Sequence, residues 1–560
     1  LYDVAARTIL SGGTHYKDVF DTNPPGFVWL LCGVRSLLGT SIEAVGAVDV
    51  LVVSAIGFLL LHAARRAGAA PAAVAWGAAG MAGFYLFISE FNHAQRDVWM
   101  MLPALVATGY RVRRVTAAHD RPVTNLRVFG TAAFEGLVWG AAVGIKPHAF
   151  PVAVAVWAVV LARWGTGRRA AADFVGVLLG GLAAGAAGIG WLVATGTWPH
   201  FYDVLTNWNT TYFHQMSSEL GERFEYQLSY FPAWSLFAVL AAPVAVLNIL
   251  DARPWRDRPT TTGPASRWVP GWLYAAPADA DARAARGVLA ALYLSWLLTA
   301  VLVQKRYHYV HVPETLLMIA VFAANRWAVS ALVLALQAAV VAWVAVGPAL
   351  TGRSVPEWTW EGAVFRHAVW AYPDRNPDRL KWWFACLSPA VSVPGQVRNG
   401  VAFQSDFFAG IDSAEIEEVA DFLRGQGVRE GEVMAWNDSP HAVYLVLGHR
   451  PPIRFMHLST AAGMGDRQYE MVQAEVARAA PGVRYVISDI RRLSLFYSYE
   501  DQQRVGEPGP SPTDHLPPVV PMADRNVFPL DQPTVFRSGG GRGRYVVHAL
   551  VCPISDVYVP

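Results

Sequence analysis

The 560-residue sequence is poor in charge: Asp, Glu, Lys and Arg make up 16% of it, whereas 54% of the residues are hydrophobic. Soluble proteins carry about a quarter charged residues, so the shortage indicates a protein that lies largely in a lipid bilayer. The mean hydropathy of +0.28 agrees with this. A net charge of only +2, with no dominant basic face, argues against a nucleic-acid-binding protein.

Cysteine is also scarce. Cys32, Cys386 and Cys552 lie far apart and lack the spacing of metal ligands. Cys386 and Cys552 fall in the part of the chain that we place outside the cytoplasm, where a disulfide is chemically allowed, although the sequence does not fix that pairing.

Several familiar signatures are missing. The chain has no phosphate-cradling Gly-Lys-Ser/Thr loop and no Gly-x-Ser-x-Gly or Ser-His-Asp nucleophile pattern. It also lacks an opening signal peptide. Because Leu1 is not a start methionine and the chain opens in polar, loop-like sequence, we expect a membrane helix to precede this numbering.

Long apolar runs dominate the first 350 residues. A run at 27–38 is too short to cross a bilayer core, which needs about 20 residues, and is interpreted as an interfacial helix. The spanning candidates that follow lie at about 44–62, 72–89, 97–110, 128–145, 147–163, 173–194, 229–250, 287–303, 309–324 and 327–348. With the missing first helix, about ten or eleven spans are predicted.

The arginines predict the orientation of these spans. Arg65 and Arg66, the arginines between 111 and 127, those between 163 and 169, those between 253 and 286, and Arg326 lie in alternate loops. The positive-inside rule makes these loops cytoplasmic. The opposite loops then share one extracytoplasmic face, together with everything after about residue 349.

The composition changes beyond 349. A Trp- and Pro-rich connector at 349–399 leads to a soluble part at 400–560, in which helical patterns alternate with short strand-like runs. Helices are predicted near 412–425, 440–447 and 466–479, and strands at 432–436, 453–456, 483–488 and 545–551, with the tail at about 500–545 as loop. The predicted fold class is an α-helical polytopic membrane protein with a C-terminal extracytoplasmic α/β domain. Its domains are the first loop with its interfacial helix (1–43), the transmembrane helices (44–348), the connector and the soluble domain.

The first outer loop holds two acids, Asp18 and Asp21, directly before Pro24-Pro25-Gly26. Carboxylates at this place can act as a general base for an acceptor hydroxyl or help to hold a divalent metal. The alternative is that both are solvated acids that cap the Pro-Pro turn.

Three further clusters fall on the same face. Arg96 could fork onto a phosphate with Asp97 orienting it, or the two form an ion pair at a helix end. Lys146-Pro147-His148 forms a tight turn whose lysine binds an anionic headgroup or anchors the interface. The positive-inside rule disfavours the basic pair Lys305-Arg306 here, so a phosphate partner explains it, with Tyr307, His308 and Tyr309 shaping the pocket; a lipid anchor with an aromatic belt is the alternative.

With these residues in place, the chain resembles the GT-C superfamily of polytopic membrane glycosyltransferases. The likeness is greatest to the bacterial branch similar to protein mannosyltransferases and aminoarabinose lipid A transferases. It spans about residues 1–350. The matching segments are Tyr2, Gly12-Gly13, the run from Tyr16 to Gly26, Leu38-Gly39-Thr40-Ser41, Gln95-Arg96-Asp97, Ile145-Lys146-Pro147-His148 and Lys305 to Tyr309 with Pro313.

The resemblance implies transfer of a sugar from a polyprenyl-phosphate carrier to an envelope lipid, glycan or protein at the outer face of the bacterial inner membrane. It implies that an acid of the first loop is the base and that a second acid before the Pro-Pro pair, here Asp21, helps bind a metal in some members. The first acid usually precedes the tyrosine matched by Tyr2, so Asp3 or Asp18 would substitute for it here.

The residues themselves agree with that chemistry. A phosphate leaving group needs cations rather than an acid, and Lys146, Lys305 and Arg306 supply them, with Arg96, His148 and His308 as further phosphate contacts. The sequence has no Rossmann-type nucleotide-sugar domain, which favours a lipid-linked donor. No cofactor other than a divalent metal is expected.

Two other functions stay open. A transporter or flippase of lipid-linked glycans is disfavoured because the middles of the spans carry almost no charge and no internal repeat is visible. A noncatalytic scaffold that binds envelope polymer is the other. The aromatic residues of the C-terminal domain have the spacing of a core, and we expect the domain to select the acceptor.

Overall fold

The structure is a computed structural model. It describes residues 2–39, 42–86, 88, 92–116, 124–164, 167–211, 220–229, 231, 234–252, 280–304, 307–325, 331–332, 335, 413–436, 440–458, 461, 464–489, 528–541 and 543–550. Most of the predicted span at 327–348, the connector at 349–399, Lys305, Arg306, Cys386 and Cys552 lie outside these residues.

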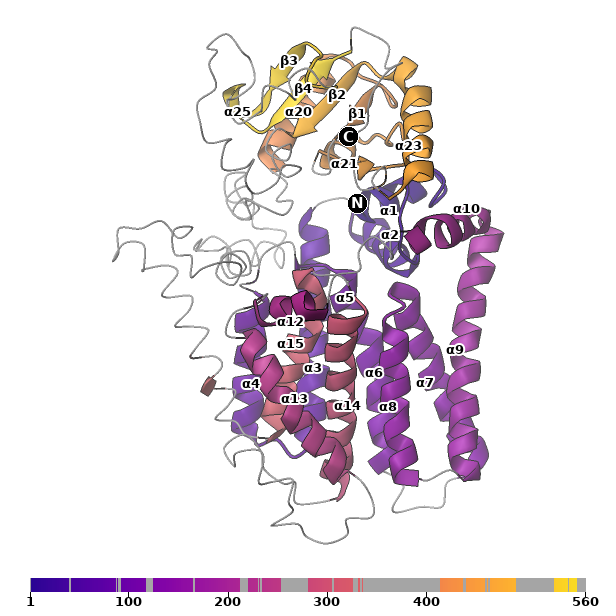
Figure 1. Ribbon diagram of the computed structural model, residues 1–560, viewed down its shortest axis with the longest axis vertical. Helices are drawn as coiled ribbons and strands as arrows, with labels where there is room; N and C mark the ends of the chain where they lie inside the picture. The colour runs from indigo at the N-terminus through magenta and orange to yellow at the C-terminus, as the bar shows by residue number, and fades with distance from the viewer. Residues whose placement is uncertain are drawn as a thin grey trace, which may run out of the picture.

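Helices make up most of the described residues up to Asn325 (Figure 1). They are α1 (Tyr2–Leu10), α2 (Gly26–Leu38), α3 (Ile42–Arg66), α4 (Pro71–Tyr85), α5 (Arg96–Trp99), α6 (Met101–Thr116), α7 (Asn125–Ile145), α8 (Ala149–Trp164), α9 (Arg168–Ala194), α10 (Trp198–Asp203), the π-helix η3 (Val204–Trp208), α12 (Leu220–Ser229), α13 (Trp234–Asp251), α14 (Ala280–Leu302), the 3-10 helix η5 (His308–His311) and α15 (Val312–Asn325).

Among the described residues, four helical stretches are long and apolar enough to cross a membrane: Ala44–Arg66, Asn125–Ile145, Arg168–Ala194 and Ala280–Leu302. The predicted fold class, a polytopic helical membrane protein with a small C-terminal α/β part, is thereby confirmed. The predicted interfacial helix at 27–38 is found as α2, and its 13 residues are too few to span the core.

Burial separates central from peripheral helices. In α14, 78% of the most apolar stretch is buried, whereas the corresponding figure for α9 is 11%. α9 packs closely against α7, because a Cβ at Gly180 would lie 1.9 Å from the carbonyl oxygen of Ala133 and one at Gly136 would lie 2.0 Å from that of Val177. Glycine is therefore needed where these two backbones meet, as is common between membrane helices.

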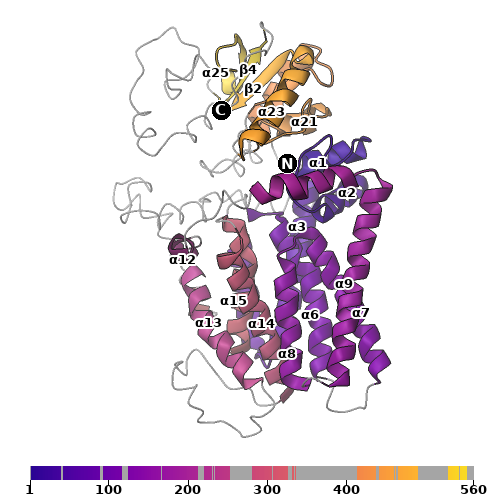
Figure 2. The same cartoon turned by 45° about the vertical axis from the view of Figure 1, so that its right-hand side comes forward.

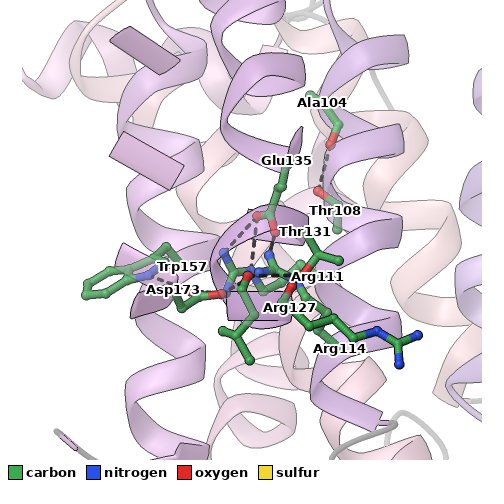
Figure 3. A network of polar contacts seen from close by, with 10 residues as sticks. Ala104, Thr108, Arg111, Arg114, Arg127, Thr131, Glu135, Trp157 and Asp173 are labelled. Atoms are coloured by element: carbon green, nitrogen blue, oxygen red, sulfur yellow. Dashed lines mark hydrogen bonds and ion pairs between the residues drawn. The ribbon is translucent and has the colours of Figure 1, made fainter. Parts of the chain in front are cut away.

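Charges lie inside this bundle: Glu135 is midway along α7, and Arg111 and Asp173 lie toward the ends of α6 and α9. Arg111 is fully buried; its Nε donates to Glu135 Oε1 at 3.0 Å and its Nη1 to Asp173 Oδ2 at 2.6 Å. Arg114 pairs with the same two acids, and Trp157 donates its indole N–H to Asp173 (Figure 3). The sequence alone does not show that Arg111 and Arg114 share these two acids, because the three helices lie far apart along the chain.

The C-terminal part is a small mixed sheet with strand order β1-β2-β4-β3, formed by β1 (Val433–Ala435), β2 (Tyr485–Asp489), β3 (Thr534–Arg537) and β4 (Tyr545–Ala549). β1 and β2 are parallel, and the other two pairs are antiparallel. The helices are α20 (Ser413–Gly425), α21 (Ala442–Leu447), α23 (Asp466–Ala479), the 3-10 turn η7 (Ala480–Gly482) and the short α25 (Ser538–Gly541).

Two predictions for this domain are corrected. The segment 453–456 is not a strand: the amide of Arg454 donates to the Glu475 carboxylate at 2.6 Å instead of to a neighbouring strand. Ile453, Phe455 and Met456 are buried there as core residues, which gave the strand-like pattern. The tail predicted as loop contains β3, whose Thr534, Phe536 and Arg537 pair with β4.

The C-terminal domain packs on the first loop. The Phe20 N–H donates to the Arg454 carbonyl at 2.8 Å, and Phe20, Trp208 and Phe455 pack with ring centroids 4.5 to 5.2 Å apart. Arg7 on α1 also donates to the Leu445 carbonyl at 2.7 Å. In both views the sheet and α23 lie beyond the end of the bundle that holds α1 and α2 (Figure 1 and Figure 2).

Candidate functional site

The first loop is folded rather than solvated. After α1, Asp18 Oδ2 accepts the Thr14 N–H at 2.6 Å and closes a turn. Tyr16 adopts φ +66°, and its hydroxyl donates to the Asn23 carbonyl at 2.6 Å. The His15 ring stacks on that of Tyr16 at a centroid distance of 3.8 Å. The loop thereby buries His15, Tyr16 and Asp21 beneath the C-terminal domain.

Asp21 is 2% exposed and lies at the centre of the loop. Its Oδ1 accepts the Asn23 N–H at 3.0 Å and the Asn23 side-chain amide at 2.6 Å, while its Oδ2 is buried without a hydrogen-bond partner. Burial raises the pKa of Asp21 to about 6, although the charges of Arg96 and His457 and the Asn23 N–H act in the opposite direction. A carboxylate with such a pKa is ionised at neutral pH and still basic enough to take a proton.

The Pro-Pro-Gly turn sets this loop against the end of α7. A Cβ at Gly26 would lie 2.4 Å from the carbonyl oxygen of Gly144, so the start of α2 touches the α7 backbone directly. Lys146 follows two residues after Gly144. The motif that the sequence places before the first apolar run therefore fixes the distance between the Asp21 loop and the lysine turn.

Arg96 provides the first cation of the site. Its guanidinium lies 5.6 Å from the centroid of the Tyr2 ring, and its Nε is 3.9 Å from Asp97 Oδ2. Nε and Nη1 are buried without hydrogen-bond partners. The Tyr2 hydroxyl in turn accepts from the Asn23 side chain at 3.2 Å, which connects Arg96 to the residue that holds Asp21.

Asp49 of α3 holds in place the short helix α5, which carries Arg96. Asp49 is fully buried and accepts hydrogen bonds from the Tyr85 hydroxyl at 2.8 Å and from the Trp99 indole N–H at 2.7 Å. Both donors belong to segments that flank the 86–95 connection. Asp49 thus orients α5, and with it Arg96 and Asp97.

Lys146 provides the second cation, at the C-cap of α7. Its ammonium group is buried, pairs with Asp97 and donates to Gln304 Oε1, and it lies 5.9 Å from the centroid of the Tyr309 ring. The Tyr309 ring is stacked on Tyr307. Burial lowers the pKa of Lys146 to about 8, while the Asp97 charge acts to raise it.

The structure thus brings together Asp21, Arg96, Asp97 and Lys146, and it places the other predicted residues elsewhere or in other states. Asp3 forms an ion pair with Arg35 of α2, and Asp18 caps its turn. Burial lowers the pKa of His148 to about 4, so its imidazole is uncharged at neutral pH. His308 is buried with its ring 6.2 Å from that of Phe231. The roles assigned to these residues, and to Lys305 and Arg306, stay predictions.

The sequence did not single out His15, Asn23, Asp49 or Gln304. Asn23 lies inside the run from Tyr16 to Gly26, His15 directly precedes that run, and Gln304 directly precedes the Lys305-Arg306 pair, so their neighbours were the available signal. Asp49 could have been noticed as an acid within an apolar run, which in a membrane helix points to a function or a partner.

The divalent metal predicted at Asp21 has few donors. Among the described residues no group of three or more His, Cys, Asp and Glu side chains could hold a metal ion. Mg²⁺ prefers several oxygen ligands, whereas the described surroundings of Asp21 include His15, Asn23 and the charges of Arg96 and His457. The donor set does not fit such an ion, and no step below passes through it.

Comparison with known proteins gives little. No protein-family model matches the sequence, and no curated protein matches it. Among solved structures, the chain is similar to the oligosaccharyltransferase of Archaeoglobus fulgidus, which was solved tethered through a disulfide bond to an acceptor peptide with an NVT sequon. The TM-score is 0.38 and the identity 12%; the match covers 88% of this chain and 64% of that one, less than two thirds of its length. We draw no conclusion about fold or activity from a likeness of this size.

Proposed function

We propose that this chain is a membrane glycosyltransferase of the GT-C type. It moves a sugar from a polyprenyl-phosphate donor to an envelope acceptor, at the extracytoplasmic face of the bacterial inner membrane. The single observation that carries the proposal is the buried, unpartnered Oδ2 of Asp21 in the same polar cluster as the two cations Arg96 and Lys146. A base beside cations, at one end of a membrane bundle, suits a reaction between a lipid phosphate and a polar acceptor.

The donor phosphate is assigned to Arg96 and Lys146. The unpartnered Nε and Nη1 of Arg96 lie on different edges of the guanidinium, so each can donate separately to an anionic oxygen of the phosphate. Lys146 adds a point charge that Asp97 and Gln304 hold in place. Lys305 and Arg306, which directly follow Gln304 in the sequence, are expected to add charge at the same place.

The reaction is a single displacement. The acceptor hydroxyl oxygen attacks the anomeric carbon and forms the new glycosidic bond, while the bond from that carbon to the phosphate oxygen breaks. Its electron pair goes to the phosphate, whose charge the two cations stabilise, and the hydroxyl proton goes to Asp21 Oδ2. Since the base and the leaving group lie on opposite sides of the sugar, the anomeric configuration inverts.

The test uses the full chain reconstituted in nanodiscs with a panel of polyprenyl-phosphate hexoses and pentoses, and measures released polyprenyl phosphate. We expect turnover by the unaltered chain and a loss of about 100-fold or more for Asp21→Asn, the usual range for a general base. Lys17→Gln is the matched control, because Lys17 is an exposed residue of the same loop. Turnover that Asp21→Asn leaves intact contradicts the proposal, and so does flipping of the donor across vesicles without any sugar transfer.

A further inference from the structure

Two side chains of the first loop face each other without hydrogen-bond partners. Asp21 Oδ2 and both ring nitrogens of His15 are buried and unpaired, and His15 Nε2 lies 3.9 Å from Asp21 Oδ2. The exposed fractions are 2% for Asp21 and 3% for His15, so bulk water does not satisfy them. Unpaired buried polar atoms are costly and rare, and two of them facing each other call for a ligand.

The loop holds both groups in place. His15 stacks on Tyr16 with an angle of 16° between the rings, and the backbone of His15 forms a bridge to Val19. Asn23 fixes the carboxylate of Asp21 through Oδ1, which leaves only Oδ2 available. The pair is therefore arranged before any ligand arrives, the condition under which a hydrogen bond contributes most to recognition.

The separation selects the chemistry of the ligand. A single oxygen atom can lie about 2.8 Å from both atoms at once, a normal hydrogen-bond length. Burial lowers the pKa of His15 to about 3, so its ring is neutral at pH 7 and carries one N–H. With that proton on Nε2, the tautomer on which the assignment rests, an atom between the two donates to the carboxylate and accepts from the imidazole. A hydroxyl does both, whereas the nitrogen of a carboxamide has no lone pair to accept with.

We propose that His15 Nε2 and Asp21 Oδ2 together bind the hydroxyl of the acceptor, so that the chain glycosylates alcohols rather than amide nitrogens. The proposal rests on the function proposed above and adds His15 as the residue that selects a hydroxyl as the acceptor. One lone pair of the hydroxyl oxygen accepts from the His15 N–H, the other attacks the anomeric carbon, and the proton goes to Asp21. His15 is thus a binding residue for the acceptor and takes no part in holding the donor.

The test compares two substitutions in the reconstituted full chain. His15→Phe keeps a flat ring on Tyr16 but removes the N–H, and His15→Gln keeps a donor near the position of Nε2. Acceptors are methyl hexosides, a Ser/Thr peptide and an Asn-x-Thr peptide, each with a donor that the unaltered chain uses. His200→Phe, in the short helix α10, is the matched control.

We expect His15→Phe to lower kcat/KM for the hydroxyl acceptor at least tenfold, with the KM for the donor unchanged. His15→Gln should recover most of the loss, and the Asn-x-Thr peptide should not be glycosylated at its amide. Hydrolysis of the donor can be measured without acceptor. If its rate in His15→Phe falls in parallel with the acceptor kcat/KM, water uses the same site, which supports the assignment.

An unchanged acceptor kcat/KM in His15→Phe overturns the inference, as does efficient transfer to the carboxamide. If His15→Phe fails to fold, the acceptor panel with the unaltered chain decides: transfer to hydroxyl acceptors alone supports the inference, and efficient transfer to the carboxamide overturns it. A wild-type chain that uses no polyprenyl-phosphate sugar defeats the proposed function instead, so the two failures are distinguishable.

Discussion

Lys146 and Asp97 form a buried ion pair that joins the end of α7 to α5, across 49 residues of chain. Neither group has water to replace its partner, since Lys146 is 5% exposed and Asp97 is fully buried. The pair therefore fixes one cation of the candidate site relative to the other, Arg96, which is the neighbour of Asp97 in sequence. It also keeps the lysine charged, because burial alone lowers the pKa of that ammonium group.

Asp97→Asn is expected to weaken use of the donor through Lys146. With the charge of Asp97 removed, the pKa of Lys146 falls further below its value of about 8, so less of the lysine is protonated at pH 7.5. The basic limb of the pH profile of kcat/KM for the donor should move to lower pH by about one unit or more, the shift expected for loss of a close opposite charge. Arg96→Lys serves as comparison: it should lower kcat/KM without moving that limb. An unmoved limb in Asp97→Asn contradicts this role.

The acidic limb should report Asp21. Its folded-state pKa of about 6 means that the carboxylate is protonated, and unable to act as a base, as the pH falls through 6. We expect kcat/KM to fall tenfold for each pH unit well below that value. The profile of Lys17→Gln should coincide with that of the unaltered chain. A profile that stays flat from pH 7 to pH 5 argues against Asp21 as the base.

The sequence predicted most of the described helices because long apolar runs are local signals; the orientation read from the arginines stays a prediction. It also predicted that Asp21, Arg96 and Lys146 share one end of the bundle. The sequence could not predict the ion-pair partners. No local pattern indicates that Asp3 pairs with Arg35 and Asp97 with Lys146. The strand predicted at 453–456 was wrong for the same reason. The Arg454 amide donates to Glu475, a contact distant in sequence, instead of to a neighbouring strand.

The network of Arg111, Glu135 and Asp173 should govern stability rather than activity. Arg111→Leu leaves two buried acids with one fewer cation, and breaking a buried ion pair on one side typically costs about 3–5 kcal/mol. Arg113→Leu is the matched control, because Arg113 is exposed on the same helix, where a substitution changes stability by about 0.5 kcal/mol or less. Thermal unfolding in detergent measures both. Equal midpoints for the two variants would show that the network contributes nothing to the packing of α6, α7 and α9.

The last prediction concerns Gly26, which begins α2 in contact with the α7 backbone. In Gly26→Ala the new Cβ meets the Gly144 carbonyl oxygen at 2.4 Å, so α2 and the Asp21 loop must move away from the Lys146 turn.

Gly33 offers a control on the same helix, since a Cβ there meets nothing within 4 Å. Gly33→Ala should be neutral or stabilise by up to about 1 kcal/mol, the usual gain of alanine over glycine within a helix. Gly26→Ala should lower kcat/KM for the donor at least tenfold in protein that still folds. The reason is that the displaced loop changes the distances from Asp21 to Arg96 and Lys146. Thermal unfolding and donor kinetics on the two variants separate these effects. Identical kinetics would mean that the contact between α2 and α7 does not set the geometry of the site.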